Sequence, residues 1–205
     1  DFFEELTGAI GTYYKKKGCY NDLMVTPHKR CSASAICYSR FHREIWMVGD
    51  CQALVGQSHI TNHKKIDKVT ANSRAAFIQG ELLSGVPQES FLKCDTGREF
   101  IIPLLRKQYY FQNNNSDSQY SYGVVDGFKI PEKYIKIIKV PENIKQIVLA
   151  SDGYPVLRQS LFDTETELSK INKMDPLCIY DNVGTKGIID GAKSFDDRAY
   201  LRIEI

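Results

Sequence analysis

Hydrophobic and polar positions along the chain follow helical and extended patterns in turn. Residues 1–17 place apolar side chains at three- and four-residue intervals before Gly18, which predicts an amphipathic helix. The same periodicity predicts helices over residues 69–83, 100–110 and 161–174. For the helix over 69–83, Thr70 or Asn72 is available as the N-terminal cap, and Gly85 ends it.

Extended patterns alternate with turn residues over much of the remaining chain. They predict strands over residues 32–38, 44–48, 51–55, 120–125, 135–140, 145–150 and 198–205. The strands on either side of Gly49-Asp50 are expected to join at a tight turn. The polar tract 112–118 and the glycine-rich tract 181–193 are predicted loops, the first of them mobile. Mostly consecutive strands without regular strand–helix alternation indicate an α+β fold with antiparallel sheets.

Composition narrows the class of protein. The chain has 205 residues, of which 42% are hydrophobic, enough for one core, so residues 1–205 are predicted to form a single domain with 86–119 as a variable loop or flap. A formal charge of +2 argues against a nucleic-acid partner. There is no spanning apolar stretch or signal-peptide pattern, and the six cysteines form no metal or disulfide framework, so we expect a cytoplasmic protein without a membrane partner.

Two acidic segments carry the candidate chemistry. Asp152 follows the apolar run 147–150, and Asp196-Asp197 precedes the apolar run 199–203. A carboxylate at the rim of a core needs a partner, and oxygen ligands at two strand ends suit Mg²⁺ or Mn²⁺. We therefore predict that Asp152 and Asp196 end neighbouring strands and lie close enough to share one cation. The alternative is that Ser151-Asp152-Gly153 is an ordinary turn and that Asp196 and Asp197 are solvated strand-end acids.

With a third segment, the ordered set resembles the metal-dependent protein phosphatases of the 2C type. Val48 to Ala53 is similar to the family's Val-Gly-Asp-Ser-Arg-Ala segment. Leu149 to Gly153 is similar to its Leu-x-Ser-Asp-Gly segment, and Asp196 to Ala199 to its Asp-Asn-x-Thr strand. Tyr122 to Gly127 falls where the family places a Gly-Asp segment. The resemblance runs from about Ala33 onward.

The resemblance implies a sandwich of two antiparallel sheets flanked by helix pairs, and two metal ions. Asp152 and Asp196 would be the catalytic metal ligands, with supporting roles open to Gly153, Asp50, Asp126 and Asp197. Asp50 would shape the sheet more than touch metal. Nothing before Ala33 resembles the family's first Asp-Gly metal motif, so the chain is expected either to lack the family's N-terminal strands or to be a divergent, bacterial-like member. At most one partial metal site is then expected. Cys51 and Gln52 replace the family's Ser and Arg, which puts substrate contacts in doubt.

The implied activity is metal-dependent hydrolysis of phosphomonoesters, on phosphoserine or phosphothreonine of a phosphoprotein substrate. The alternative is a pseudophosphatase-like binding module, with an incomplete metal site, that recognises a phosphoprotein or regulatory partner. A third reading is an unrelated α+β domain whose acidic turns are coincidental. Cys51 could be a nucleophile, but it lies between two strands without a neighbouring base, which favours a structural thiol. His59 and His63 are expected to be surface side chains.

Overall fold

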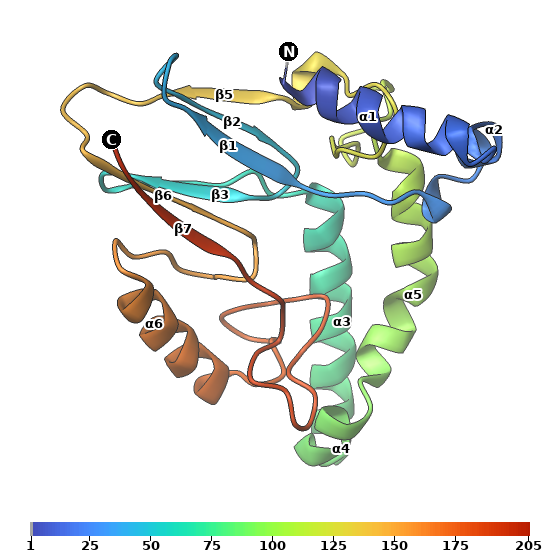
Figure 1. Ribbon diagram of the computed structural model, residues 1–205. Coiled ribbons are helices and arrows are strands. Elements are labelled where there is room, and N and C mark those ends of the chain that lie inside the picture. The colour runs from blue at the N-terminus through green and yellow to red at the C-terminus, as the bar shows by residue number, and fades with distance from the viewer. Residues whose placement is uncertain (1) are drawn as a thin grey trace.

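The chain folds into two antiparallel sheets and a set of helices (Figure 1), as seen in a computed structural model that describes residues 2–205. One sheet has three strands in the order β1-β2-β5, and the other has four in the order β4-β3-β6-β7. The strands are β1 (Ala35–Ser39), β2 (Glu44–Val48), β3 (Gln52–Val55), β4 (Ser58–Ile60), β5 (Lys136–Lys139), β6 (Gln146–Ala150) and β7 (Tyr200–Glu204). Neighbouring strands pair antiparallel throughout, which confirms the predicted α+β class.

The helices occupy the first part of the chain, its middle and the segment before β7. The α-helices are α1 (Phe2–Lys16), α2 (Tyr20–Val25), α3 (Lys65–Leu83), α4 (Gln88–Lys93), α5 (Thr96–Gln108) and α6 (Leu161–Met174). Short 3₁₀ turns are η1 (Pro27–Lys29), η2 (Tyr109–Phe111) and η3 (Glu132–Tyr134). Within residues 2–205, none of the helices combines the length and the apolar character that a bilayer crossing requires.

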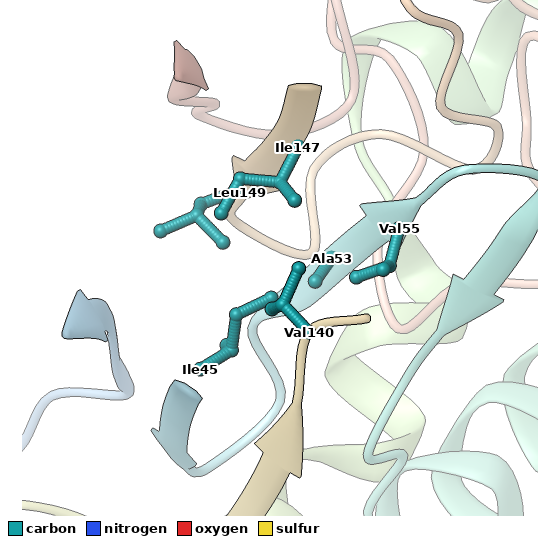
Figure 2. Packing of buried hydrophobic residues seen from close by; sticks show 6 residues of the cluster. All are labelled: Ile45, Ala53, Val55, Val140, Ile147 and Leu149. Atoms are coloured by element: carbon teal, nitrogen blue, oxygen red, sulfur yellow. The ribbon is translucent and has the colours of Figure 1, made fainter. Parts of the chain in front are cut away.

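The largest apolar core lies between the two sheets. Figure 2 shows Ile45 of β2 and Val140, which follows β5, facing residues of β3 and β6. Ile45 and Ile147 are completely buried. Burial of such side chains is worth about 1.5–3 kcal/mol each, so this contact holds the two sheets face to face. The cluster comprises Ile45, Ala53, Val55, Val140, Ile147 and Leu149.

The outer faces of the sheets are covered by different helices. Phe3 of α1 packs with Val48 and Val125 on the outer side of the three-stranded sheet. Leu168 of α6 packs with Leu54 and Val148 on the outer side of the four-stranded sheet. In both sheets the alternation of side chains along the strands separates these residues from the central core. The molecule therefore has a sheet–sheet centre with α1 and α6 on opposite sides (Figure 1).

The remaining helices α3 and α5 pack side by side beyond the strand ends (Figure 1). Arg74 of α3 is completely buried, and its guanidinium contacts the carboxylate of Asp95 at 2.8 Å. It also donates to the carbonyl oxygens of Leu177 and Gly184, at 2.9 and 3.1 Å. Asp95 caps the N-terminus of α5 by accepting from the N–H of Arg98. One buried ion pair thus connects α3, α5 and the loop that follows α6.

Most predicted elements are confirmed, but four expectations are wrong. The helix predicted over 69–83 begins at Lys65, and Thr70 lies inside it, where its hydroxyl bonds the carbonyls of Ile66 and Asp67 instead of capping. The range 86–119, expected as a loop or flap around a helix over 100–110, also contains α4, and the expected helix is α5, which begins at Thr96. These helices bury Phe91 and Ile101. Only the last residues of this range form the expected irregular segment.

The third wrong expectation is the strand over residues 120–125, which forms only isolated bridges. Asn113 satisfies this segment with its side chain, which donates to the carbonyl of Val124 and accepts from its N–H. Gln112, expected in a loop that does not pack, is buried and donates to Asp126 at 2.7 Å. The side-chain amide of Asn113 thus pairs with Val124, while Tyr122 and Val125 bond the backbone of Phe111, Asn113 and Ala33.

Candidate functional site at an acidic sheet edge

Three acidic segments meet at one edge of the four-stranded sheet. The turn with Asp50 enters β3, the turn with Asp152 leaves β6, and Asp196 precedes β7. Gln52 pairs with Ala150, which also pairs with Tyr200. The expectation that Asp152 and Asp196 flank the ends of neighbouring strands is confirmed. We call the group Asp50, Asp152 and Asp196 the acidic edge.

The backbone around Asp152 is fixed to the segment before β7. The N–H of Ser151 donates to the carbonyl of Ala199, and the N–H of Ala199 donates to the hydroxyl of Ser151 at 2.9 Å. A side chain on Gly153 would overlap the carbonyl oxygen of Asp197. Gly153 therefore has a structural reason to lack a side chain, since it lets the two acidic segments approach each other.

Gln52 holds the same turn from the side of β3. Its amide donates to the carbonyls of Ser151 and Tyr154, each at 2.7 Å, and its oxygen is 2.6 Å from Nε2 of His59. Gln52 is buried, and His59 is an exposed residue of β4. Gln52 is therefore a residue that orders the Asp152 turn.

Asp50 lies where β2, in one sheet, passes to β3 in the other. Its carboxylate accepts from the hydroxyl of Ser34 and lies 2.5 Å from Nζ of Lys64, which is also 3.6 Å from Asp67. Burial opposes the charge of Lys64, but Asp50 and Asp67 raise its pKa well above the usual range. Burial likewise opposes ionisation of Asp50, yet Lys64 lowers the pKa of Asp50. This pair is a fixed ammonium–carboxylate contact beside the acidic edge.

Asp152 and Asp196 have different surroundings. Burial, then the negative charges of Asp50 and Asp196, raises the pKa of Asp152 to about 6. Among residues 2–205, no cationic side chain lies within ion-pair distance of Asp152. Asp196, in contrast, lies 2.5 Å from Nζ of Lys186 and accepts from the N–H of Asp197. Asp152 is therefore the carboxylate whose repulsion with its neighbours is not offset by a direct partner.

The raised pKa of Asp152 predicts a pH-dependent effect of Asp152→Asn. Because the folded state holds this proton more tightly than the unfolded chain, the stability it contributes is present below pH 4 and lost as pH rises through about 6. We expect Asp152→Asn to raise the melting temperature at pH 7.5 and to leave it unchanged near pH 3.5. Calorimetric unfolding at both pH values measures this, with exposed Asp117→Asn as the matched control. An equal shift at both pH values would contradict it.

The acidic edge offers part of a divalent-cation site. Asp152 and Asp196 present carboxylate oxygens, and the unrelieved repulsion at Asp152 is what a cation would remove. However, within residues 2–205 there is no group of three or more His, Cys, Asp or Glu side chains that could hold a metal ion. Asp50 and Asp196 also form ion pairs with the ammonium groups of Lys64 and Lys186. Two carboxylates without a third such ligand do not complete a metal site, and the described residues do not fit a two-metal centre.

The other candidate residues lie in different surroundings. Asp126 is completely buried, and it accepts from Arg30 and Asn113 as well as from Gln112, so it does not join the acidic edge and is not an exposed hairpin turn. Cys51 is buried, and burial followed by the charges of Asp50 and Asp152 raises the pKa of its thiol to about 11. A thiol that resists ionisation is a poor nucleophile, as the structural reading predicted.

Lys64 and Lys186 are the functional candidates that sequence reasoning missed. Each lies in a segment without periodic structure, and lysine in a loop is ordinarily a solvated residue. The sequence indicates them in one way: a partly buried carboxylate needs a cation nearby. Nothing in the local pattern shows which lysine lies within reach.

Comparison with known proteins adds one structural match. No family model matches the sequence, and no curated protein matches it. Among solved structures, a bacterial serine phosphatase carrying a point mutation matches with 12% sequence identity and a TM-score of 0.38. The match covers 98% of this chain, which spans 65% of the length of that protein. At this level of similarity, any assignment of function depends on the residues of the acidic edge.

Proposed function

We propose that this protein is a phosphatase 2C-like domain that hydrolyses phosphomonoesters on phosphoserine or phosphothreonine with the help of Mg²⁺ or Mn²⁺. The observation that carries the proposal is the convergence of Asp50, Asp152 and Asp196 at one sheet edge, where Asp152 has a raised pKa. Perturbed carboxylates that gather in this way are typical of functional sites. Its motifs resemble those of the 2C-type phosphatases in order and spacing.

An open groove beside the acidic edge could admit the substrate. It has a volume of about 450 Å³ and is lined by Tyr154, Leu161, Glu165, Asp196, Asp197, Arg198 and Tyr200. Arg198 is held by two hydrogen bonds to Glu165, each of 2.8 Å, and Glu165 also accepts from Tyr154. This network gives the groove a rigid polar wall. A phosphorylated side chain of a protein substrate would lie along it with its phosphoryl group toward Asp196.

In the proposed reaction, Asp152 and Asp196 supply oxygen ligands and orient the attacking water. A divalent cation held by these two carboxylates would supply a lowered pKa of that water and positive charge toward the phosphoryl oxygens. For Asp196 to act as a ligand, Lys186 would have to release it. The ammonium group of Lys186 would then pair with a phosphoryl oxygen in the groove. Asp50 remains paired with Lys64 and shapes the edge. Because two carboxylates fill only part of an octahedral shell, metal binding is expected to be weak.

A second candidate is the binding module, which the ion pairs favour. Lys64 and Lys186 already pair with Asp50 and Asp196, so two of the three carboxylates have a cationic partner without metal. A domain of this kind would hold a phosphoprotein partner without turnover. It would differ from the enzyme in one measurable respect: its binding of a phosphoprotein would not depend on Mn²⁺.

A Mn²⁺ titration combined with a phosphatase assay tests the proposal. We expect slow release of phosphate from p-nitrophenyl phosphate and from a phosphoserine peptide, a Mn²⁺ dissociation constant of about 1 mM or weaker, and loss of turnover in Asp152→Asn. Asp117→Asn, an exposed residue of the polar tract, should retain turnover.

The outcomes separate the two candidates. Metal-independent binding of the phosphoserine peptide without turnover would replace the enzyme by the binding module. If Asp152→Asn retains turnover, the catalytic site lies somewhere other than the acidic edge. Tight binding of two Mn²⁺ ions would show that the edge has a ligand beyond the carboxylates named here.

A further inference from the structure

A second cavity lies next to the acidic edge and has the opposite charge. Its volume is about 300 Å³, at the lower end of the range for small-molecule sites. It is formed by the turn at Gly49, the start of α3 and segments 119–123 and 133–136. Within residues 2–205 its lining includes no Asp or Glu, and its basic side chains are His63, Lys64, Lys65, Lys133 and Lys136.

Three of these lysines keep an uncompensated charge. Lys64 is paired with carboxylates, as described above, but for the part of the chain that the structure covers Lys65, Lys133 and Lys136 have no carboxylate within ion-pair distance. Lys133 donates to the carbonyl of Ser116 and Lys136 to that of Thr61, each at 3.2 Å. These neutral acceptors place the ammonium groups at the cavity without neutralising them. Several like charges around one cavity give it a positive potential.

The other lining residues supply hydrogen-bond donors and fix the wall of the cavity. The amide of Asn62 is fixed by the carbonyl of Gly49 at 2.8 Å. Lys64 precedes α3 without a side-chain cap, so the first turn of this helix adds positive potential on the same side. The ring of Tyr134 lies under the ammonium of Lys133, and its hydroxyl donates to the carbonyl of Asn114. The cavity thus has a wall fixed by hydrogen bonds and cationic side chains placed at its surface.

We propose that this cavity, here called the lysine pocket, binds a phosphoryl group carried by a larger molecule. A phosphoryl group has two negative charges near neutral pH and several acceptor oxygens, which lysines bind as point charges. The volume exceeds what that group alone needs, so part of the carrier enters as well. The lysine pocket is separated from Asp152 by the Asp50–Lys64 pair, and its binding requires neither metal nor hydrolysis.

The experiment measures binding in EDTA and in the Asp152→Asn background, so that failure of the proposed hydrolysis does not affect it. The probes are inorganic phosphate, a phosphoserine peptide and ADP, titrated calorimetrically at low salt. The variant Lys65→Gln/Lys133→Gln/Lys136→Gln is expected to weaken phosphate binding at least about tenfold. The control variant Lys16→Gln/Lys93→Gln/Lys173→Gln loses the same charge elsewhere on the surface and should change binding less than about twofold.

Further measurements identify the carrier and check that the variants are folded. Whichever of the peptide and ADP binds more tightly than phosphate identifies the carrier, and both should lose affinity with the pocket variant. Replacement of the three lysines by arginine should retain binding, and melting temperatures should show that all variants fold. The proposal is overturned if wild type binds none of the probes at about 20 mM, or if the two triple variants weaken binding equally, which would indicate only general charge attraction.

Discussion

Replacing Arg74 by alanine is expected to lower the free energy of unfolding by about 3–5 kcal/mol, the cost of removing one partner from a buried ion pair. The guanidinium is completely buried and contacts Asp95 through two nitrogen atoms. Without it, Asp95 keeps its N-cap bond but loses its cation, and the carbonyls of Leu177 and Gly184 lose a donor. Buried acceptors left without a donor add to the cost.

Urea unfolding followed by circular dichroism measures this loss. Arg106→Ala, on the exposed side of α5, is the matched control and should change the free energy of unfolding by less than about 0.5 kcal/mol. Equal stability of the two variants would mean that the attraction between Arg74 and Asp95 only offsets the free-energy cost of burying the two charges.

Asp126→Ala is expected to destabilise the fold by about 2–4 kcal/mol, because it leaves several buried donors without an acceptor. Asp126 accepts from Arg30 at 3.0 Å, from Gln112 at 2.7 Å and from Asn113 at 2.8 Å. Arg30 additionally stacks on Phe128, with 3.9 Å between the guanidinium carbon and the ring centroid. The carboxylate therefore connects the segment after α2 with the turn after α5.

The corresponding measurement is again urea unfolding, with exposed Asp181→Ala as the control. Hydrogen exchange of the amides in 110–128 should speed up in Asp126→Ala before global unfolding, since these residues lack a neighbouring strand. A loss no larger than that of Asp181→Ala would show that water replaces the carboxylate without cost.

The sequence predicted the elements with strong local patterns. The apolar stripe of residues 1–17 and the run 161–174 correspond to α1 and α6, and the apolar run 145–150 corresponds to β6. Because strand ends follow from such runs, the meeting of Asp152 and Asp196 at one edge could also be predicted. The close approach at Gly153 agrees with that arrangement.

The remainder depended on contacts that no local pattern contains. Gln112 looked like a loop residue because its composition is polar, yet it is buried by pairing with Asp126, fourteen positions later. Lys186 looked solvated, but it lies against Asp196. Residues 120–125 have the composition of a strand but form only isolated bridges, and the side chain of Asn113 bonds the backbone of Val124. Tertiary context overrides propensity in each case.

The clamp of Gln52 on the Asp152 turn has a consequence for biosynthesis. Gln52 and Ser151 are 99 positions apart in the chain, and β6 must pair with both β3 and β7. Such distant pairings form slowly, because the intervening chain has to be ordered first. A nascent chain that has reached only β6 therefore exposes a pairing edge and an unshielded carboxylate until β7 is translated. We expect the unpaired edge of β6 to be open to non-native strand pairing or chaperone contact during this interval.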